Sequence, residues 1–386
     1  MRVYLDHNAT TPVWPAVLEA MSAVFLEDFG NASSVHAFGQ AAKRRLEEAR
    51  RRVAQILGAQ PNEIVFTSGG TEADNLAILG LVRNDKRPVK HVITSAIEHP
   101  AVLETCAQLE REGVAVTRLP VNSQGLVDPD DVRRALRPET VLISIMHANN
   151  ELGTIQPIAE IARVAREAGV WMHSDGVQAL GKVPVHVADL GVDLYSISAH
   201  KIYGPKGVGA LFVRQGVPLG RVQFGGHHER DRRAGTENVP GAVGLAAAVS
   251  LMQSDFEQET ARLGRLRDRL EQGILERVPD VVVNGRGAPR VPNTSNLCFR
   301  GVDGEALLIA LDLAGFAVSS GAACSSGASE PSHVLTAIGL SRRDARSCLR
   351  FSLGRLNTEE QIERLIEAAA EAVARLRALA PVQSRV

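Results

Sequence analysis

Lys201 is the residue in this sequence whose neighbours best suit nucleophilic chemistry. It follows a β-branched run and precedes a glycine-rich loop, in the stretch Ser198-Ala-His200-Lys201-Ile-Tyr-Gly204. A lysine amine that is partly desolvated in such a place becomes a nucleophile that can form a Schiff base. The other lysines lie in charged, glycine-rich or otherwise less suitable surroundings, and they are Lys43, Lys86, Lys90, Lys182 and Lys206.

Gly69, Gly70 and Thr71 form a candidate anion site between a predicted strand and a predicted helix. Free N–H groups at a helix N-terminus attract anions, the glycines let the backbone approach a phosphate, and Thr71 adds a hydroxyl. The alternative is a capped helix after a tight turn, and the motif alone does not separate the two. The pattern is neither Gly-x-x-x-x-Gly-Lys-Ser/Thr nor Gly-x-Gly-x-x-Gly, which argues against nucleoside triphosphates and dinucleotides.

Asp175 and His99 also follow predicted strands closely. An Asp at the mouth of a parallel sheet can hold a protonated ring nitrogen or a metal ion, and its burial without a partner would be costly. Its alternative role is a helix N-cap. His99 could stack on a planar cofactor or act as an acid or base near neutral pH, although a lone His is more often structural.

Cys324 and Arg350 lie in the last third of the chain. Small polar residues surround Cys324 in the loop 319–331, which is typical of a mobile nucleophile, and the alternative is an incidental exposed thiol. Arg350 is a single charge in a predicted strand, where a guanidinium could capture a substrate carboxylate. His227 and His228 are adjacent and would point apart on a regular element, so we predict no metal site.

The elements that must position these residues alternate between strands and helices. Such alternation indicates βαβ units, a largely parallel sheet and an α/β fold. Ligands bind beyond the carboxyl ends of the strands in such sheets, which is where the candidate residues fall. The predicted strands span residues 63–66, 91–94, 115–119, 141–146, 170–173, 194–198 and 210–213, with helices such as 158–168 between them.

A second, smaller α+β unit is predicted after a long helix at residues 257–278. Its strands are expected at 281–284, 296–299 and 348–353, and its helices at 304–314 and from Thr358 onward. Thr358 and Gln361 have the spacing of a capping box, which marks the start of the last helix.

Composition excludes several classes of protein. The 386 residues include 43 Lys and Arg against 44 Asp and Glu. The chain therefore lacks the excess of basic residues that is typical of nucleic-acid-binding proteins. No apolar run approaches the roughly 18 residues of a membrane span, and the first residues do not form a secretory signal. The four cysteines include no Cys-x-x-Cys pair, which argues against a zinc ribbon or a disulfide framework. We therefore expect a cytoplasmic protein with no membrane partner.

Together these stretches resemble the cysteine desulfurases of the NifS/IscS type, which are pyridoxal-phosphate enzymes of aminotransferase class V. The resemblance covers nearly the whole chain, and several motifs in the same order are more specific than any one of them. The motifs are Tyr4-Leu-Asp-His-Asn-Ala-Thr-Thr-Pro12, Asn31-Ala-Ser-Ser34, Thr67-Ser-Gly-Gly-Thr-Glu-Ala-Asp-Asn75, Met146-His-Ala-Asn-Asn-Glu-Leu-Gly153, Ser198-Ala-His-Lys-Ile-Tyr-Gly-Pro-Lys-Gly207 and Arg233-Ala-Gly-Thr-Glu-Asn238.

The resemblance implies the fold of type I PLP-dependent transferases. In that fold a large PLP-binding domain, here residues 15–257, contains a mainly parallel seven-stranded sheet. A smaller α+β domain, here residues 1–14 and 258–386, contains the loop of the catalytic cysteine.

The resemblance also implies the cofactor and the reaction. With pyridoxal 5'-phosphate bound, the enzyme would remove sulfur from L-cysteine and leave L-alanine and a persulfide on Cys324. Lys201 would form an imine with the cofactor and move the substrate proton, and His99 would stack on the ring. Asp175 would pair with the ring nitrogen and Gln178 with the phenolic oxygen.

The other site residues would hold the phosphate and the substrate. Thr236 would reach the phosphate from the second subunit of a homodimer, and Asn150 and Arg350 would bind the substrate. The phosphate contacts within the chain would come from Gly70, Thr71, Ser198 and His200. An acceptor protein, such as an iron–sulfur scaffold or a tRNA-thiolation protein, would then take the sulfur.

The sequence departs from the family pattern in three places. The usual Gly-Gly-Gly before His-Glu reads Gly225-Gly226-His227, and a Gly often found near Arg230 is Asp231. The chain also stops soon after its last predicted helix, whereas some homologues have a longer tail that docks a scaffold protein.

Two other interpretations stand beside the desulfurase. Another class V enzyme, such as a selenocysteine lyase or a small-molecule aminotransferase, would share the fold and cofactor, but an aminotransferase would not need Cys324. A binding module without enzymatic activity would not need Lys201, Asp175 and His99 at three separate strand ends.

Overall fold

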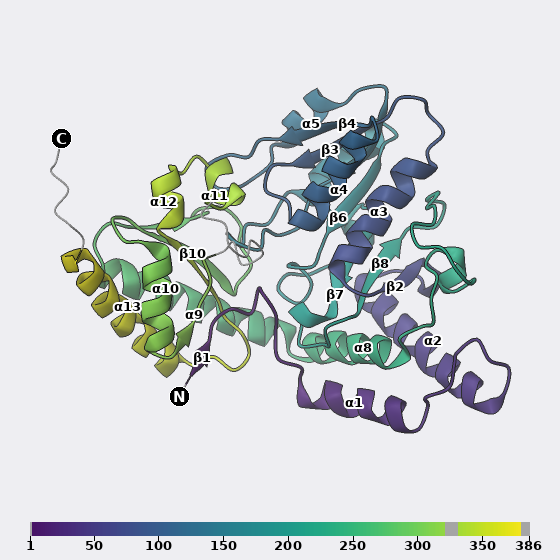
Figure 1. Cartoon of the computed structure of the whole chain (residues 1–386), viewed down its shortest axis with the longest axis horizontal. Helices are drawn as coiled ribbons and strands as arrows, with labels where there is room; N and C mark the ends of the chain where they lie inside the picture. The colour runs from purple at the N-terminus through teal and green to yellow at the C-terminus, as the bar shows by residue number, and fades with distance from the viewer. Residues whose placement is uncertain (1, 321–330, 380–386) are drawn as a thin grey trace.

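The computed structural model describes residues 2–320 and 331–379. Cys324 and most of the predicted loop 319–331 lie outside these residues, so both stay predictions from the sequence. The chain forms two lobes of unequal size (Figure 1). We call the part from α1 (Pro15–Leu26) to α8 (Val239–Ser254) the large lobe, and β1 (Val3–Tyr4) together with everything from α9 (Phe256–Arg277) onward the small lobe.

The large lobe is built on a seven-stranded sheet that confirms the predicted fold class. Strand β8 is antiparallel to β2 and β7, and the remaining neighbours pair in parallel. The strands, in the sheet order β2-β8-β7-β6-β5-β3-β4, are β2 (Ile64–Thr67), β8 (Gly209–Val213), β7 (Leu194–Ser198), β6 (Trp171–Asp175), β5 (Thr140–Ser144), β3 (His91–Ser95) and β4 (Ala115–Leu119). Each of the seven predicted strands overlaps one of these.

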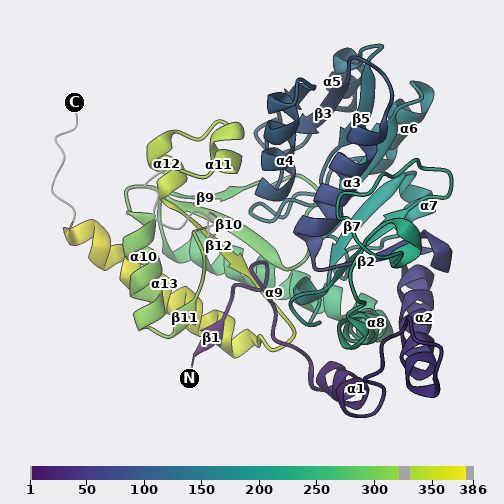
Figure 2. The ribbon, with the colours of Figure 1, turned by 45° about the vertical axis from the view of Figure 1, so that its right-hand side comes forward.

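Alternation along the strands gives the sheet two apolar faces, and helices cover both (Figure 2). Ile64 and Phe66 of β2 belong to one core cluster, whereas Val65 belongs to the other. The first face packs against α2 (Ala37–Leu57), α5 (Pro129–Ala135), α6 (Ile158–Glu167), α7 (Val187–Leu190) and α8. The second face packs against α3 (Gly70–Asn84) and α4 (Pro100–Arg111).

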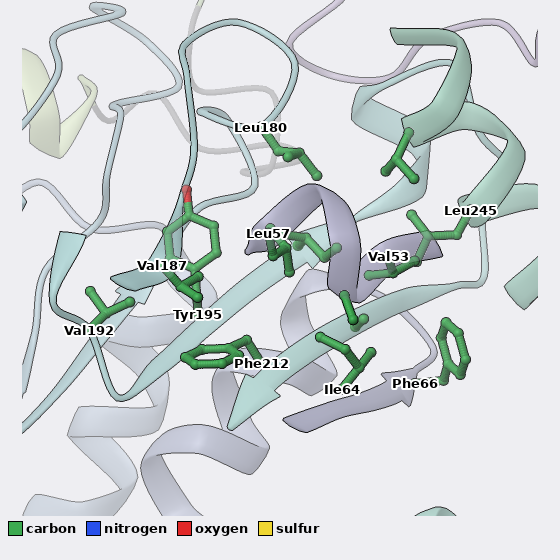
Figure 3. Packing of buried hydrophobic residues seen from close by; sticks show 14 of the residues in the cluster. Val53, Leu57, Ile64, Phe66, Leu180, Val187, Val192, Tyr195, Phe212 and Leu245 are labelled. Atoms are coloured by element: carbon green, nitrogen blue, oxygen red, sulfur yellow. The ribbon is translucent and has the colours of Figure 1, made fainter. Parts of the chain in front are cut away.

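Figure 3 shows the first of these cores. Leu57 of α2 and Leu245 of α8 lie over the sheet residues Ile64, Tyr195 and Phe212, and all five side chains are buried. Helix α8 is apolar around its whole circumference because α1 and α2 pack against it as well as the sheet. None of the helices in the described ranges is long and apolar enough to cross a membrane.

The small lobe contains an antiparallel three-stranded sheet and a second apolar core. Its sheet has the order β12-β10-β9, with β12 (Cys348–Ser352), β10 (Thr294–Phe299) and β9 (Val281–Asn284). Strand β1 pairs in parallel with β11 (Phe316–Ala317), so the N-terminal strand belongs to the lobe built from the last third of the chain. The helices are α9, α10 (Gly304–Leu313), α11 (His333–Ala337), α12 (Arg342–Arg346) and α13 (Glu359–Leu379).

Two sequence predictions concern this lobe. Thr358 and Gln361 bond reciprocally, each side chain accepting from the other's backbone N–H at 3.3 Å, which confirms the capping box. The predicted domain boundaries at residues 14/15 and 257/258 stay predictions.

The loop before α8 has an unusual backbone that the sequence did not reveal. Glu229, Arg230 and Asp231, the short 3₁₀ segment η3 (Glu229–Asp231), have φ values of +46°, +54° and +66°. The Glu229 carboxylate fixes this segment by accepting from both terminal nitrogens of Arg50, at 2.7 and 2.8 Å, and from Phe66 N. Asp231 stands where the family often has Gly, the residue for which a left-handed conformation costs least.

Candidate functional site

Lys201 lies where the two lobes meet. Strand β7 ends at Ser198, and the short 3₁₀ helix η2 (Ala199–Lys201) then brings the half-buried amine of Lys201 against the N-terminal segment. Its Nζ donates to the carbonyl oxygens of Asn8 and Ala9, at 2.6 and 2.7 Å. The amine therefore sits at the carboxyl end of the sheet, as the sequence predicted.

Asp175 ends the neighbouring strand β6 and is almost fully buried. One carboxylate oxygen accepts from Val177 N at 2.9 Å. Burial raises the pKa of Asp175, while the charges of His99 and Lys201 oppose that rise, so the three side chains share one electrostatic environment. A Cβ on Gly176 would lie 2.0 Å from the ring of Tyr195, so glycine is what lets the chain pass this side chain after Asp175.

His99 is the N-cap of α4, and its Nδ1 accepts from Ala101 N at 3.1 Å. The neutral ring therefore has its proton on Nε2. Burial lowers the pKa of His99; the charge of Asp175 raises it, and those of Lys201 and His333 lower it further. A neutral imidazole beside Asp175 and Lys201 suits contact with a flat ring better than binding of an anion.

Two buried acids, Asp74 and Glu98, interact electrostatically with Asp175. Burial raises the pKa of Asp74 well above its usual value and that of Glu98 to about 8. His173 Nε2 lies 3.6 Å from Asp74 Oδ1, and burial lowers the pKa of His173 to about 3, so this contact is not an ion pair at neutral pH. The charge of Asp175 also raises the pKa of Asp74 and of Glu98, so the three carboxyl groups interact with one another.

The N-terminus of α3 and the end of β7 form a second part of the site. A Cβ on Gly70 would lie 2.8 Å from Val177 Cγ2 and 3.7 Å from Ser198 Cβ, so glycine is what lets the helix start against β7. Ser198 Oγ is buried and has no hydrogen-bond partner among the described residues. Such an orphaned hydroxyl beside a helix N-terminus indicates a missing acceptor, and a phosphate fits both.

His200 and Thr71 lie at the edge of the same region. His200 Nδ1 is 3.2 Å from Thr10 Oγ1, and burial lowers the pKa of His200 to about 4, so its ring is neutral. Thr71 is exposed at the first turn of α3.

Gln178 is held from two sides. Its Nε2 donates to Asn8 O at 2.9 Å, and its Oε1 accepts from the amine of the buried Lys182. Sequence reasoning set Lys182 aside and did not single out Asn8. The available signal was the four-residue spacing of Gln178 and Lys182 directly after a strand that ends in Asp.

Arg350, on β12, donates to Asn150, but its guanidinium is already paired with a carboxylate of the chain. Its Nη2 donates to Asp6 Oδ1 at 2.7 Å and its Nη1 to Asn150 O at 3.1 Å. Its buried Nε has no partner within the described part of the chain. Asp6 therefore already neutralises a guanidinium that the sequence suggested would face a substrate alone.

Thr236 is the described candidate that the chain does not bring to this site. It is exposed in the loop between η3 and α8, and its side chain makes no hydrogen bond with the residues above in the described structure. Its assignment to a second subunit stays a prediction, as does the role of Cys324.

Comparison with known proteins places this arrangement in a family. Residues 3–365 match the aminotransferase class V family. The cysteine desulfurase IscS of Methanosarcina thermophila is 49% identical over 98% of this chain and 94% of its own length. A solved NifS-like protein superimposes with a TM-score of 0.91 at 37% identity, covering 97% of this chain and all of that one.

A further solved relative is relevant to the substrate. SspA, determined in complex with cysteine, is 38% identical and has a TM-score of 0.83 over 92% of this chain and 99% of its own. The chain belongs to the aminotransferase class V family and, within it, to the cysteine desulfurases of the NifS/IscS type.

Proposed function

We propose that this cysteine desulfurase binds pyridoxal 5'-phosphate across the ends of β6 and β7 and uses it to remove sulfur from L-cysteine. The observation that supports this most is the grouping of Lys201, Asp175 and an orphaned Ser198 hydroxyl at two adjacent strand ends. An amine, a buried acid and an anion site in one place match three functional groups of that cofactor, which are its aldehyde, its ring nitrogen and its phosphate.

The residues present fit the two ends of the cofactor. Asp175 would hold the proton on the ring nitrogen, because a buried carboxylate without a cationic partner is costly. Gln178 would donate to the phenolic oxygen, and His99 would lie on the ring face. The phosphate would take hydrogen bonds from Ser198, His200, Thr71 and the N–H groups of Gly70 and its neighbours at the start of α3.

When bound, the cofactor supplies an electron sink for the carbon next to the substrate amino group. Lys201 would hold the cofactor through its amine, and the same amine would then move the proton at that carbon. Arg350 and Asn150 would orient the substrate carboxylate. The Nε–H of Arg350 is the donor left for a substrate, because Nη1 and Nη2 already donate to Asn150 and Asp6.

Cys324 would accept the sulfur. Its thiolate attacks the substrate sulfur, a new S–S bond forms as the Cβ–S bond breaks, and the electron pair of that bond stays with carbon. Protonation of the carbon releases L-alanine. The products are L-alanine and a Cys324 persulfide, so no external oxidant or reductant is required.

The test is single-turnover release of alanine and formation of persulfide from L-cysteine. Wild type should form both, Lys201→Ala neither, and Cys324→Ala no persulfide with alanine formation lowered at least about 100-fold, by analogy with the loss of other catalytic nucleophiles. Lys206→Ala, in the exposed loop five residues beyond Lys201, is the matched control and should behave as wild type. Alanine release by Cys324→Ala at the wild-type rate would favour an aminotransferase-like relative instead.

We further propose that the enzyme is a homodimer in which Thr236 reaches the phosphate of the other subunit. Exposed apolar side chains on and around α1 support a covered surface there, because large exposed apolar patches mark interaction sites. They are Leu18, Phe25, Leu26, Phe29, Val35 and Phe38.

Mixed dimers of Thr236→Ala and Lys201→Ala subunits test both parts of this proposal. If Thr236 acts across the interface, one of the two sites in each mixed dimer is intact, and mixing should restore about half of the wild-type activity per dimer. If Thr236 acts within its own chain, every site contains a defect and mixing restores nothing. A monomer in sedimentation equilibrium would refute the dimer itself.

The persulfide would pass to an acceptor protein in the cytoplasm, such as an iron–sulfur scaffold or a tRNA-thiolation protein. Incubation with ³⁵S-cysteine should label a candidate acceptor through wild type but not through Cys324→Ala. Label that stays on the desulfurase with every candidate would reject those acceptors.

A further inference from the structure

Lys182 is a second buried lysine at the site, and the proposed reaction gives it no role. It is only 8% exposed, and its amine donates to Gln178 Oε1 and, at 3.0 Å, to Asn8 Oδ1. Burial lowers the pKa of Lys182 well below its usual value, and the charges of Lys201 and Arg350 lower it further. Even the uncharged amine has two N–H groups, so both hydrogen bonds persist in either protonation state.

These contacts decide which way the Gln178 carboxamide faces. The Lys182 N–H groups need oxygen acceptors, so Oε1 of Gln178 turns toward Lys182 and Nε2 turns away. Nε2 then donates one of its two hydrogens to Asn8 O at 2.9 Å. The second hydrogen is left for a ligand. The reversed amide would set its oxygen against the carbonyl oxygen of Asn8 and, with the amine protonated, would also set two donors against each other at Lys182.

Asn8 holds the other side of this arrangement. It is 2% exposed, and its carbonyl oxygen accepts from both Gln178 Nε2 and Lys201 Nζ. Its Nδ2 donates to Asn150 O and to Thr294 Oγ1, at 3.0 and 2.8 Å. Asn8 therefore ties three proposed site residues of the large lobe to β10 of the small lobe.

We propose that Lys182 is a positioning residue, whose amine fixes the Gln178 carboxamide so that an N–H rather than the oxygen is available to the bound cofactor. The inference rests on the proposed function, since it needs a cofactor oxygen that Gln178 contacts. A lysine that merely fills space at this position would not determine the orientation of its neighbour.

The experiment is a double-mutant cycle on Lys182 and Gln178 in the holoenzyme, using Lys182→Met, Gln178→Ala and the double variant. The readout is the balance between the ionised and protonated absorbance bands of the bound cofactor at one fixed pH. Loss of a hydrogen bond to a charged oxygen should shift that balance about tenfold or more toward the protonated form in each single variant. The double variant should shift no further than Gln178→Ala alone.

Two further variants keep the cycle interpretable. Lys182→Gln retains an N–H donor in place of the amine and should recover part of the shift, with KM for L-cysteine near wild type. Lys86→Met, at an exposed lysine in the loop after α3, should leave both bands unchanged.

The outcomes distinguish a failure of the positioning role of Lys182 from a failure of the proposed function. Additive shifts, or wild-type bands in Lys182→Met, would overturn the positioning role while leaving the proposed function intact. Failure of the wild-type enzyme to bind pyridoxal phosphate, or wild-type bands in Gln178→Ala, would instead contradict the assignment of Gln178 and of the cofactor. If Lys182→Met does not fold, Lys182→Leu, which also removes the N–H donors, takes its place in the same cycle.

Discussion

The two ends of the candidate site are built in different ways. At the ring end, formed by Asp175, Gln178 and His99, each side chain has a hydrogen-bond partner within the chain. At the phosphate end, formed by Gly70, Thr71, Ser198 and His200, a buried hydroxyl has no described partner and Thr71 is exposed. The chain thus completes one end by itself and leaves the other to a ligand and, on our proposal, to a second subunit.

The difference follows from what each end has to do. Groups that act on developing charge must be oriented before reaction, since reorganising them during it would cost rate. Groups that hold a phosphate contribute equally before and during reaction, so they raise affinity without raising kcat. Substitutions at the two ends should therefore differ in whether excess cofactor repairs them.

The largest expected effect is at the ring end. Asp175→Asn should lower kcat about 100- to 1,000-fold, because a neutral amide stabilises a cationic ring nitrogen far less than a carboxylate does. Steady-state rates with L-cysteine at saturating cofactor measure this. Asp74→Asn is the matched control, since Asp74 is buried nearby but has no proposed contact with the cofactor, and it should cost less than tenfold. Recovery of Asp175→Asn by excess cofactor would remove the distinction between the ends.

At the phosphate end, Ser198→Ala should raise the cofactor dissociation constant about 10- to 100-fold, the loss of one hydrogen bond to a charged acceptor. The rate should recover at high cofactor concentration. Ser196→Ala, two residues earlier on β7, is the control, because Ser196 Oγ lies 3.0 Å from His173 Nε2. It should lower stability by about 1–3 kcal/mol and leave cofactor affinity near wild type. Equal affinities in the two variants would reject the phosphate assignment.

Glu98, a buried acid that interacts with Asp175, predicts a pH dependence of stability. Burial raises the pKa of Glu98 from 4.5 to about 8, so between these values the folded state binds a proton that the unfolded state has lost. Stability should therefore fall as pH rises through this window, by up to about 1.4 kcal/mol per pH unit for this group.

Glu98→Gln removes that proton and should flatten the fall. Urea unfolding of both proteins at pH 5.5 and 7.5 measures the difference. Glu112→Gln serves as control, since its hydrogen bond from Arg83 lowers the pKa of Glu112 to about 2 and the group does not titrate in this window. A parallel fall in wild type and Glu98→Gln would show that other groups cause it.

The smallest expected effect concerns the loop that leads to Thr236. Asp231→Gly should be more stable than Asp231→Ala by about 1 kcal/mol, because φ is +66° there and a Cβ is strained. Both variants lose the same contacts with Arg221 and His227, so their difference isolates the backbone. Equal melting temperatures would mean that this segment relaxes when Asp231 is changed.

Local patterns in the sequence predicted most of the fold. Strand β7 was predicted at residues 194–198 and the segment at 281–284 matches β9, both residue for residue. Helix α8 was not predicted, because its sequence is apolar on most sides and so lacks the stripe of an amphipathic helix.

The candidate site was predictable only as far as its members are local. Lys201 and Asp175 could be found because each directly follows a strand in its own motif. The contact of Lys182 with Asn8 joins residues 174 positions apart, and Asp6 reaches Arg350 across 344. No spacing rule covers such pairs, so their roles came from the structure.

The pairing of β1 with β11 has a consequence for the making of the protein. Val3 aligns with Phe316, and Asn8 bonds to Thr294 and Ser352, so these residues find their partners only after 286 to 344 further residues have been synthesised. At about 5–20 residues per second, the N-terminal strand waits roughly 15–60 s. A nascent chain halted before residue 316 should therefore bind cofactor poorly, even with the whole seven-stranded sheet outside the tunnel.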